Sequence, residues 1–390
     1  MTLSVVIPNW NQSRYLAGAI DSLLAQTRPP DEILVVDDGS TDGCDRVVAG
    51  RGDRVRLLRQ DRGGLAAARN AGILAARGAF VGLLDADDRW SPAFVEAWQA
   101  SRAAHPDATV YYCGAQAIDD DERPLPQRFG GPPVPSDRLR ARLLRANFLI
   151  PSTIVLRRAA VIEAGLFDTG FRSAQGCEDW DLWLRLLPRH EFAGLEACHA
   201  RYRVHPAAMS ADPAGMQRSA RRVMEKQFGP DDGRWAGWSA EQRRGWGGFY
   251  RYALLSSIQR RDDWAAAPDH LHRAIAIDPD LASDLDLFYD LALGAQPAGH
   301  RGTATGLDLD ANAARIGTLV ADVAARPGAG PWRRALRATA CRALGLAAYN
   351  TRHYRASRRF LASAVYYQPR LLGNQLVAGD LVKSFLRGGL

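Results

Sequence analysis

Short apolar segments alternate with longer amphipathic segments over the first hundred residues. The apolar segments have the length of buried strands, whereas the segments between them place apolar residues three or four apart, as helices do. Strands joined by helices at this spacing favour right-handed crossovers and a mostly parallel sheet. The predicted strands cover residues 3–7, 32–36, 55–58 and 80–84, and the predicted helices cover about 15–25 and 65–76.

The alternation continues less regularly as far as about residue 212. A helix is predicted at about 92–103, strands near 109–113 and at 152–156, and another helix at 179–187. Residues 119–135 are acidic and then rich in Gly and Pro, which is typical of a surface loop. The pattern predicts an α/β domain over residues 1–212.

Segments rich in Ala, Arg and Trp follow, and they predict an α-helical domain over residues 213–390. Within it, residues 253–279 and 344–369 resemble the latter part of a tetratricopeptide repeat. Their closing prolines, Pro279 and Pro369, are 90 residues apart, so the segments are not adjacent repeats. Because a solenoid normally needs about three repeats, a helical layer packed on the first domain is an equal alternative.

Three carboxylates stand directly after the fourth predicted strand. Asp85, Asp87 and Asp88 follow the apolar residues 80–84, and open α/β sheets bind ligands at the carboxyl ends of their strands. Asp85 and Asp87 can turn toward one hard cation, for which oxygen ligands favour Mg²⁺ or Mn²⁺. The alternative is a solvated turn that caps the helix after Pro92.

Five motifs indicate a family. They are Ser4-Val-Val-Ile-Pro-Asn-Trp-Asn11, Glu32-Ile-Leu-Val-Val-Asp-Asp-Gly-Ser-Thr-Asp42, Gly64-Leu-Ala-Ala-Ala-Arg-Asn-Ala-Gly72, the acidic stretch 78–92 and Glu178-Asp-Trp-Asp-Leu-Trp-Leu-Arg185. In order and spacing they resemble the family 2 glycosyltransferases of GT-A fold, over roughly residues 3–210. The resemblance implies a Rossmann-like sheet flanked by helices, and transfer of a sugar from a nucleotide-sugar donor.

The resemblance also implies where the nucleotide base binds. A carboxylate at a strand end can accept the N–H of uracil, and the residue that matches is Asp38, with Asp37 as the alternative. Trp10 or Pro8 would cover the ring. Asp38 could instead cap the helix beyond Thr41.

The rest of the donor site is implied in the same way. Arg69 and Asn70 are expected near the ribose or the phosphates, although an arginine on a helix face is often only a solvated charge. Asp87 matches the principal metal ligand, and Asp85 would reach the ribose, or the metal through water. His205 matches a loop that closes over the diphosphate and is a further candidate metal ligand, whereas a lone histidine is usually structural or exposed.

The fifth motif supplies the candidate catalytic residue. An acceptor hydroxyl must lose its proton as it attacks, which requires a general base. The residue that matches is Asp179, with Glu178 pointing elsewhere and Asp181 capping or bracing the helix. One base on the face opposite the leaving diphosphate implies a single displacement with inversion.

Composition adds few further constraints. The chain of 390 residues has a formal charge of +7, and its 50 basic residues include only two lysines. Such a protein can be drawn to an anionic membrane surface, but no nucleic-acid recognition motif is present. Five scattered cysteines indicate neither a disulfide framework nor a zinc site. No apolar run has the length of a membrane span and no signal peptide is evident, so a cytoplasmic protein is expected, with peripheral contact at the inner face of the membrane as an option.

The leading hypothesis is an inverting, metal-dependent glycosyltransferase that uses a UDP-sugar and acts on a saccharide, lipid-linked or peptide hydroxyl. Synthesis of surface polysaccharide or glycoconjugate is the expected setting, and modification of peptides is the alternative. An interaction protein with a degenerate transferase domain is a second class, and the carboxyl-terminal helices could support a homo-oligomer. Sugar nucleotidyltransferases are disfavoured, because their phosphate loop is rich in Gly and Lys and this amino terminus has no lysine. Dehydrogenases are disfavoured, because Pro8-Asn-Trp-Asn11 stands where Gly-x-Gly-x-x-Gly would follow the first strand.

Overall fold

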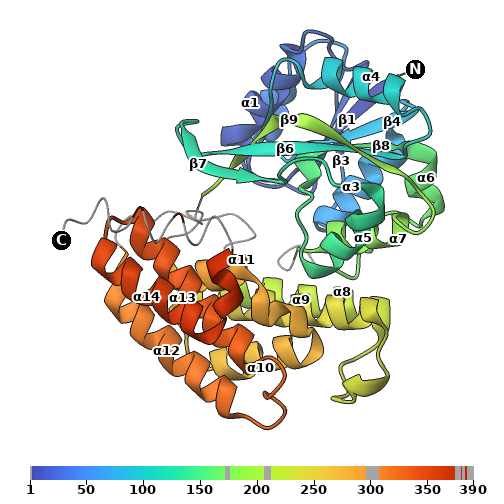
Figure 1. Cartoon of the computed structure of the whole chain (residues 1–390). Helices are drawn as coiled ribbons and strands as arrows, with labels where there is room; N and C mark the ends of the chain where they lie inside the picture. The colour runs from blue at the N-terminus through green and yellow to red at the C-terminus, as the bar shows by residue number, and fades with distance from the viewer. Residues whose placement is uncertain are drawn as a thin grey trace. The chain divides into compact units, whose positions relative to one another are not determined.

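A nine-stranded sheet forms the framework of the amino-terminal part of the chain (Figure 1). The computed structural model describes residues 2–171, 176–205, 212–295 and 307–373, together with 379 and 383. The chain divides into two compact units, Met1–Gln227 and Phe228–Leu390. The predicted domain boundary after residue 212 falls just before α8 (Pro213–Phe228), whereas the compact units divide at its far end. The domain assignment itself stays a prediction.

The first four strands follow the predicted alternation. β1 lies between β2 and β4, β3 flanks β2, and all of these pairings are parallel. The buried Val, Ile and Leu side chains of β1 and β2 explain why these segments are strands, since both faces of the sheet are covered. The elements are β1 (Leu3–Asn9), α1 (Ser13–Leu24), β2 (Glu32–Asp37), α2 (Cys44–Val48), β3 (Val55–Arg59), α3 (Leu65–Ala75) and β4 (Phe80–Leu83).

The second half of the sheet is mixed. β8 pairs antiparallel with both β4 and β6, and β9 runs parallel to β6. β5 pairs antiparallel with β9, and β7 pairs antiparallel with β6. The expected parallel order therefore holds for β1 to β4 and for β6 with β9. The strands are β5 (Arg89–Trp90), β6 (Val110–Ile118), β7 (Pro124–Phe129), β8 (Ile154–Arg157) and β9 (Phe192–Arg203).

Three of these strands were not predicted. β7 lies inside the segment expected to be a surface loop, and its mostly exposed side chains give no apolar pattern. β5 has two residues, and β9 includes charged and small residues that mask its alternation. The α/β fold with flanking helices is confirmed. The helices of this half are α4 (Phe94–Ala104), α5 (Ser136–Arg145), α6 (Arg158–Glu163), α7 (Glu178–Leu186) and the 3₁₀ turn η1 (Pro151–Thr153).

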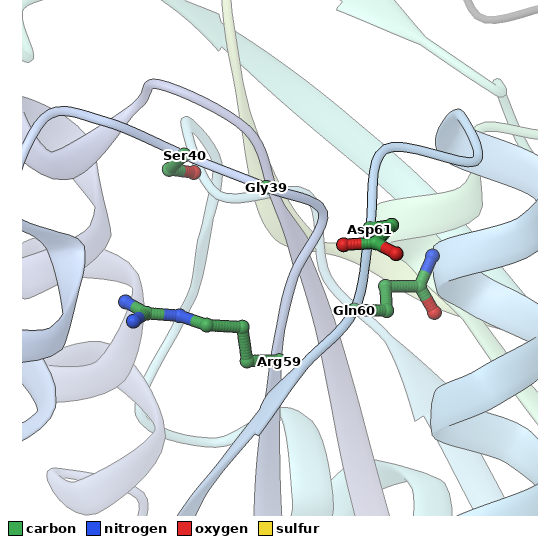
Figure 2. A pocket seen from close by; sticks show the side chains of 5 residues that line it. All are labelled: Gly39, Ser40, Arg59, Gln60 and Asp61. Atoms are coloured by element: carbon green, nitrogen blue, oxygen red, sulfur yellow. The ribbon is translucent and has the colours of Figure 1, made fainter.

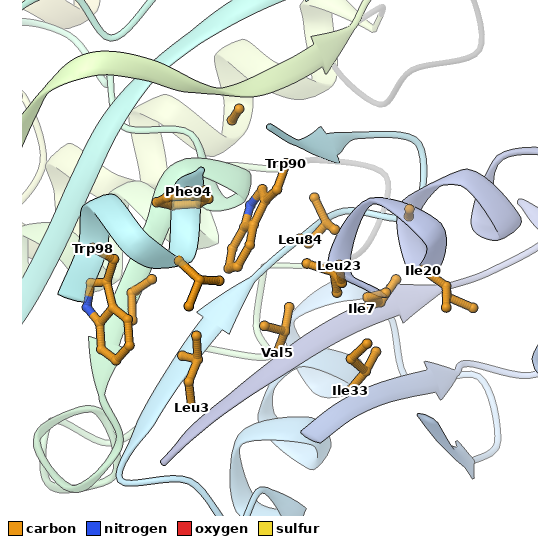
Figure 3. Close-up of a cluster of buried hydrophobic side chains, with 14 of the residues drawn as sticks. Leu3, Val5, Ile7, Ile20, Leu23, Ile33, Leu84, Trp90, Phe94 and Trp98 are labelled. Atoms are coloured by element: carbon orange, nitrogen blue, oxygen red, sulfur yellow. The ribbon is translucent and has the colours of Figure 1, made fainter. Parts of the chain in front are cut away.

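The core of the first unit joins the sheet to α1 and α4. Figure 3 shows Val5 of β1, Leu23 of α1 and Trp98 of α4 within one buried cluster. On the other side, Gly72 lets α3 approach β1, because a Cβ at this position would lie 2.3 Å from Cγ1 of Val6. This close packing holds α3, which bears Arg69, against the sheet.

The second unit is made of helices. The two repeat-like segments form parts of two helical hairpins, α9 with α10 and α13 with α14. In the second hairpin a Cβ on Gly345 would lie 2.7 Å from Cγ of Leu361, so only glycine permits this approach. Tetratricopeptide character stays a prediction. The elements are α9 (Ala240–Arg261), α10 (Ala267–Ile277), α11 (Leu285–Ala292), α12 (Leu309–Ala325), α13 (Arg333–Asn350), α14 (Tyr354–Tyr367) and the 3₁₀ turns η3 (Trp235–Gly237), η4 (Pro279–Ser283) and η5 (Pro369–Gly373).

Candidate functional site

The loops that follow β1 and β2 are tied together by short polar side chains. The hydroxyl of Ser40 accepts hydrogen bonds from Nδ2 of Asn9 at 3.2 Å and from the backbone N–H of Asn11 at 3.0 Å. Of the two residues predicted to cover a base, Pro8 is buried within β1, whereas Trp10 is 43% exposed. The guanidinium of Arg62 lies 3.2 Å from the centroid of the Trp10 ring. Trp10 is therefore the accessible one.

The two carboxylates at the end of β2, those of Asp37 and Asp38, both accept hydrogen bonds from neighbouring residues. Asp37 is fully buried and accepts hydrogen bonds from the Ser40 N–H and from Nε of Arg59, each at 2.9 Å. Burial by itself would raise the pKa of Asp37, but the hydrogen bonds from Ser40 and Arg59 hold it below its ordinary value. Asp38 accepts from Nε2 of Gln60 at 2.7 Å and from the N–H groups of Gly63 and Gly64 at 2.8 Å.

Asp38 thus shapes the loop that leads into α3. The alternative that it caps the helix beyond Thr41 is wrong, because that helix, α2, follows Gly43 and has no side-chain cap. Beside this loop a cavity of about 470 Å³ opens between the strand ends of β2 and β3 (Figure 2). It is lined by Gly39, Ser40, Arg59, Gln60 and Asp61.

Arg69 joins two acidic motifs that are far apart in the sequence. It lies on α3, is 1% exposed, and binds Oδ1 of Asp85 at 2.6 Å and Oε1 of Glu178 at 2.5 Å. Burial would lower the pKa of Arg69, but Asp85 and Glu178 raise it above its ordinary value. The alternative of a merely solvated charge is wrong, since this guanidinium is buried and bound to two carboxylates. Contact of Arg69 with the ribose or the phosphates stays a prediction.

Asn70, the next residue, makes a reciprocal pair with the backbone of Phe167. Its Nδ2 donates to the Phe167 carbonyl at 2.8 Å, and its Oδ1 accepts from the Phe167 N–H at 2.9 Å. Its amide therefore holds the turn before α7 in place against α3. Contact with a donor ribose stays a prediction for Asn70.

The carboxylates after β4 have three different environments. Asp87 is partly exposed, and its Oδ2 lies 3.0 Å from Nε2 of the buried His205. Asp85 pairs with Arg69 as above. Asp88 is buried and accepts hydrogen bonds from Oγ of Ser152 at 2.5 Å and from the N–H of Arg203 at 2.8 Å.

Arg203 holds the acidic loop after β4 in place through hydrogen bonds. Its Nε donates to the Asp87 carbonyl at 2.8 Å, and its Nη1 donates to the carbonyls of Asp119 and Asp120 at 2.8 and 2.9 Å. Within the described residues, no three His, Cys, Asp or Glu side chains converge as a complete metal site. The Asp87 and His205 side chains do meet, as candidates for one ligand set. The part of the predicted loop after His205, residues 206–210, lies outside the described residues.

Asp179 stands in the first turn of α7, beside Glu178. Its Oδ2 accepts from Nδ2 of Asn147 at 3.0 Å, and its Oδ1 accepts from the N–H of Trp180 at 2.7 Å. Burial, and next the charge of Glu178, raise the pKa of Asp179 to about 7. A carboxylate with such a pKa can accept a proton near neutrality, which suits a general base.

Asp181 has the bracing position expected of it, since it is buried and forms ion pairs with Arg185 at 2.9 Å and with Lys226 at 2.7 Å. Sequence reasoning missed Asn147, Ser152 and Arg203, which orient the acidic residues. Asn147 and Ser152 stand in segments without any motif. Arg203 stands two residues before the predicted His205, and this proximity was its only signal.

Comparison with known proteins finds a family match within the first unit. The family model described as "Glycosyl transferase family 2" matches residues 4–165. These residues form a family 2 glycosyltransferase domain. An uncharacterized glycosyltransferase of Nostoc sp. is 37% identical to this chain over 155 residues, which cover 38% of this chain and 47% of that protein.

Two further comparisons extend the picture of the glycosyltransferase domain. The hyaluronan synthase of Pasteurella multocida is 26% identical over 230 residues, covering 58% of this chain and 23% of that protein. The crystal structure of S. aureus TarS 1-349 in complex with UDP-GlcNAc has a TM-score of 0.50 at 18% identity, covering 95% of this chain and 92% of that one. This likeness shows the fold. The chain spans about half the length of the first curated relatives it matches, between 47% and 58%.

No helix in the described parts of the chain is both long enough and apolar enough to cross a membrane.

Proposed function

We propose that the protein transfers a sugar from a UDP-linked donor to an acceptor hydroxyl with inversion at the anomeric carbon. The observation that supports this most is the buried bridge through Arg69, which joins Asp85 to Glu178. It brings the carboxylates after β4 to the start of α7, where Asp179 has a pKa of about 7. Donor-side and acceptor-side groups thus belong to one site, as a single displacement requires.

The loops after β1, β2 and β3 would hold the nucleotide. Trp10 offers an exposed ring for stacking on uracil. Among the described residues, Oδ2 of Asp38 accepts one hydrogen bond, from the Gly64 N–H, so a lone pair is left for the uracil N–H. Asp37 is the weaker candidate, because it is fully buried and hydrogen-bonds Arg59, Cys44, and both the N–H and the side chain of Ser40. TarS, which shares the fold, was crystallised with UDP-GlcNAc, so this is the donor to test first.

A divalent cation fits the donor set of Asp87 and His205. A carboxylate oxygen and an imidazole nitrogen that meet at 3.0 Å are a ligand pair that Mn²⁺ accepts, and the diphosphate would supply further oxygens. Asp85, which forms an ion pair with Arg69, would act on the metal through water or on the ribose. When bound, the ion would neutralise charge on the departing diphosphate.

The chemical step rests on the residues around α7. Asp179 would take the proton of the acceptor hydroxyl while that oxygen bonds to the anomeric carbon, and the bond from this carbon to the diphosphate oxygen breaks. Asn147 holds the Asp179 carboxylate through a hydrogen bond of 3.0 Å. Arg69 forms an ion pair with the adjacent Glu178, whereas Asp179, whose pKa is raised to about 7, would be the carboxylate that changes its proton.

The acceptor is proposed from the relatives. Hyaluronan and chondroitin synthases are among them, which favours a saccharide acceptor in polysaccharide or glycoconjugate synthesis. A lipid-linked or peptide acceptor is the alternative. A degenerate, purely interacting protein is disfavoured, because the acidic residues are intact and ordered in one network. Cytoplasmic localisation and oligomerisation through the helices stay predictions.

The test is a thermal-shift screen of the full-length protein with UDP and UDP-sugars, with and without Mn²⁺. Ligand at about 100 times its dissociation constant should stabilise the protein by about 2.7 kcal/mol. Release of UDP on addition of saccharide acceptors would then be measured. If no UDP-sugar stabilised the protein in the presence of Mn²⁺, the proposed donor would be contradicted. Equal stabilisation in excess chelator would show that donor binding does not need a divalent cation.

A further inference from the structure

The α13–α14 hairpin concentrates the positive charge of the whole protein. Between Arg333 and Gly373 there are nine arginines and no Asp or Glu. This excess is larger than the net charge of the full chain, +7, so the remaining residues together are slightly acidic. The basic character therefore belongs to one structural element rather than to the protein in general.

The outer side of α14 shows how this charge is presented. Ser357, Leu361 and Ala364 are buried, and α14 packs against α13. On the opposite side lies a face that we call the α14 face. It consists of Arg355, Arg359, Ala362 and Tyr366, which are all exposed and follow the helical spacing i, i+4, i+7, i+11. The α14 face is about 16 Å long at the rise of an α-helix.

The α14 face has a basic half and an apolar half. Arg352 is exposed just before the helix, and Arg352, Arg355 and Arg359 make no ion pair among the described residues. At the other end Tyr366 is 81% exposed, and Leu372, in the 3₁₀ turn that follows, is 59% exposed. The guanidinium of Arg337 on α13 lies 5.8 Å from the centroid of the Tyr367 ring, so a further positive charge borders the apolar half.

We propose that the α14 face binds the surface of an anionic lipid bilayer. Guanidinium groups bind phosphate oxygens with two N–H donors each, and exposed tyrosine and leucine side chains insert at the level of the headgroups. Charge complementarity selects anionic lipid over neutral lipid. The apolar half favours a bilayer over a nucleic acid, whose phosphates would satisfy only the arginines. The inference concerns the second unit and does not depend on the proposed sugar transfer.

The test uses the full-length protein and sedimentation with vesicles. One set contains phosphatidylcholine alone, and the other contains equal parts of phosphatidylcholine and phosphatidylglycerol. A triple variant with Arg352→Gln, Arg355→Gln and Arg359→Gln keeps good helix formers and removes three charges. Each basic residue at an anionic surface contributes roughly fivefold in partitioning, so the triple variant should bind the anionic vesicles about 100-fold more weakly. Adding Tyr366→Ser to the triple variant should weaken binding to the anionic vesicles further.

Matched controls separate this face from net charge. Arg46, Arg54 and Arg189 are exposed in the first unit, and replacing all three by Gln removes the same charge. That variant should bind like wild type, and a triple Arg→Lys variant of the α14 face should retain binding. Equal binding to neutral vesicles, equal losses in the two Gln variants, or tighter binding of duplex DNA than of anionic vesicles at the same salt would each overturn the proposal. An unchanged melting temperature of the variants shows that folding is not the cause.

Discussion

Replacement of Asp179 by Asn should separate catalysis from stability. The pKa of Asp179 is raised from 3.8 to about 7, so the folded state holds this proton more tightly than the unfolded state does. Stability that depends on this proton is present at low pH and is lost as pH rises from about 4 to about 7. A shift of about three units corresponds to about 4 kcal/mol at pH 8, as an order of magnitude.

Asn removes this cost because it cannot ionise. It can accept only one of the two hydrogen bonds that Asn147 and Trp180 donate, and the loss of one costs about 1 kcal/mol. At pH 8 the Asp179→Asn variant should therefore be more stable than wild type by up to about 3 kcal/mol, and the gain should vanish near pH 4. Urea unfolding at both pH values measures it.

The same variant should be a poor catalyst. Loss of a general base lowers the transfer rate by about 10²- to 10⁴-fold, with donor affinity nearly unchanged. Wild-type kcat/KM should rise with pH with an apparent pKa of about 7, and this limb should be missing in the variant. Transfer would be followed by UDP release on one acceptor, with a donor titration for each protein.

Asp181→Asn is the matched control. Asp181 is buried on the same helix but forms ion pairs with Arg185 and Lys226, so its replacement should destabilise the protein, by about 3–5 kcal/mol, and spare the rate per folded molecule. An Asp179→Asn variant that transfers sugar at nearly the wild-type rate, or fails only because the donor no longer binds, would refute the assignment of the base.

Three further variants test other contacts of the structure. Asp87→Asn should weaken Mn²⁺-dependent UDP binding at least tenfold, about 1.4 kcal/mol by calorimetry, and unchanged binding would remove Asp87 from the donor site. Arg69→Gln leaves the buried Glu178 and the partly buried Asp85 without their partner, so urea unfolding should show a loss of about 3–5 kcal/mol; a loss below about 1 kcal/mol would contradict the bridge. Gly345→Ala should destabilise the α13–α14 hairpin by about 1–3 kcal/mol, because the added methyl group would contact Leu361. The control Gly317→Ala, in open space on α12, should stabilise the protein by up to about 1 kcal/mol. Equal effects of the two substitutions would show that the close approach at Gly345 is not needed.

Predictability differed between the two halves of the sheet. β1, β2 and β4 are buried on both faces, so their apolar runs could be recognised without knowing their neighbours. β7 and β9 expose many side chains, and β5 has only two residues, so their strand character depends on the partners with which they pair. The mixed order of the sheet could not be predicted for the same reason.

The candidate site shows a similar division. Asp85, Asp87, Asp179 and His205 could be named because each stands in a recognisable motif. The residues that surround them could not be predicted, because Asn147 has no motif of its own and the Asp87–His205 contact joins residues 118 positions apart in the chain. The raised pKa of Asp179 depends on burial, which no residue pattern specifies.

By itself the sequence determined which segments form the first strands and helices and where carboxylates leave them, because periodicity and strand ends are local properties of the chain. The tertiary structure alone decided that Arg69, 109 residues from Glu178 in the chain, bridges that carboxylate to Asp85. It also decided which of the adjacent acids, Glu178 or Asp179, is paired and which retains a proton near neutrality. Burial and charge pairing are properties of three-dimensional neighbours, and they set proton affinity within a site whose residues the sequence can only name.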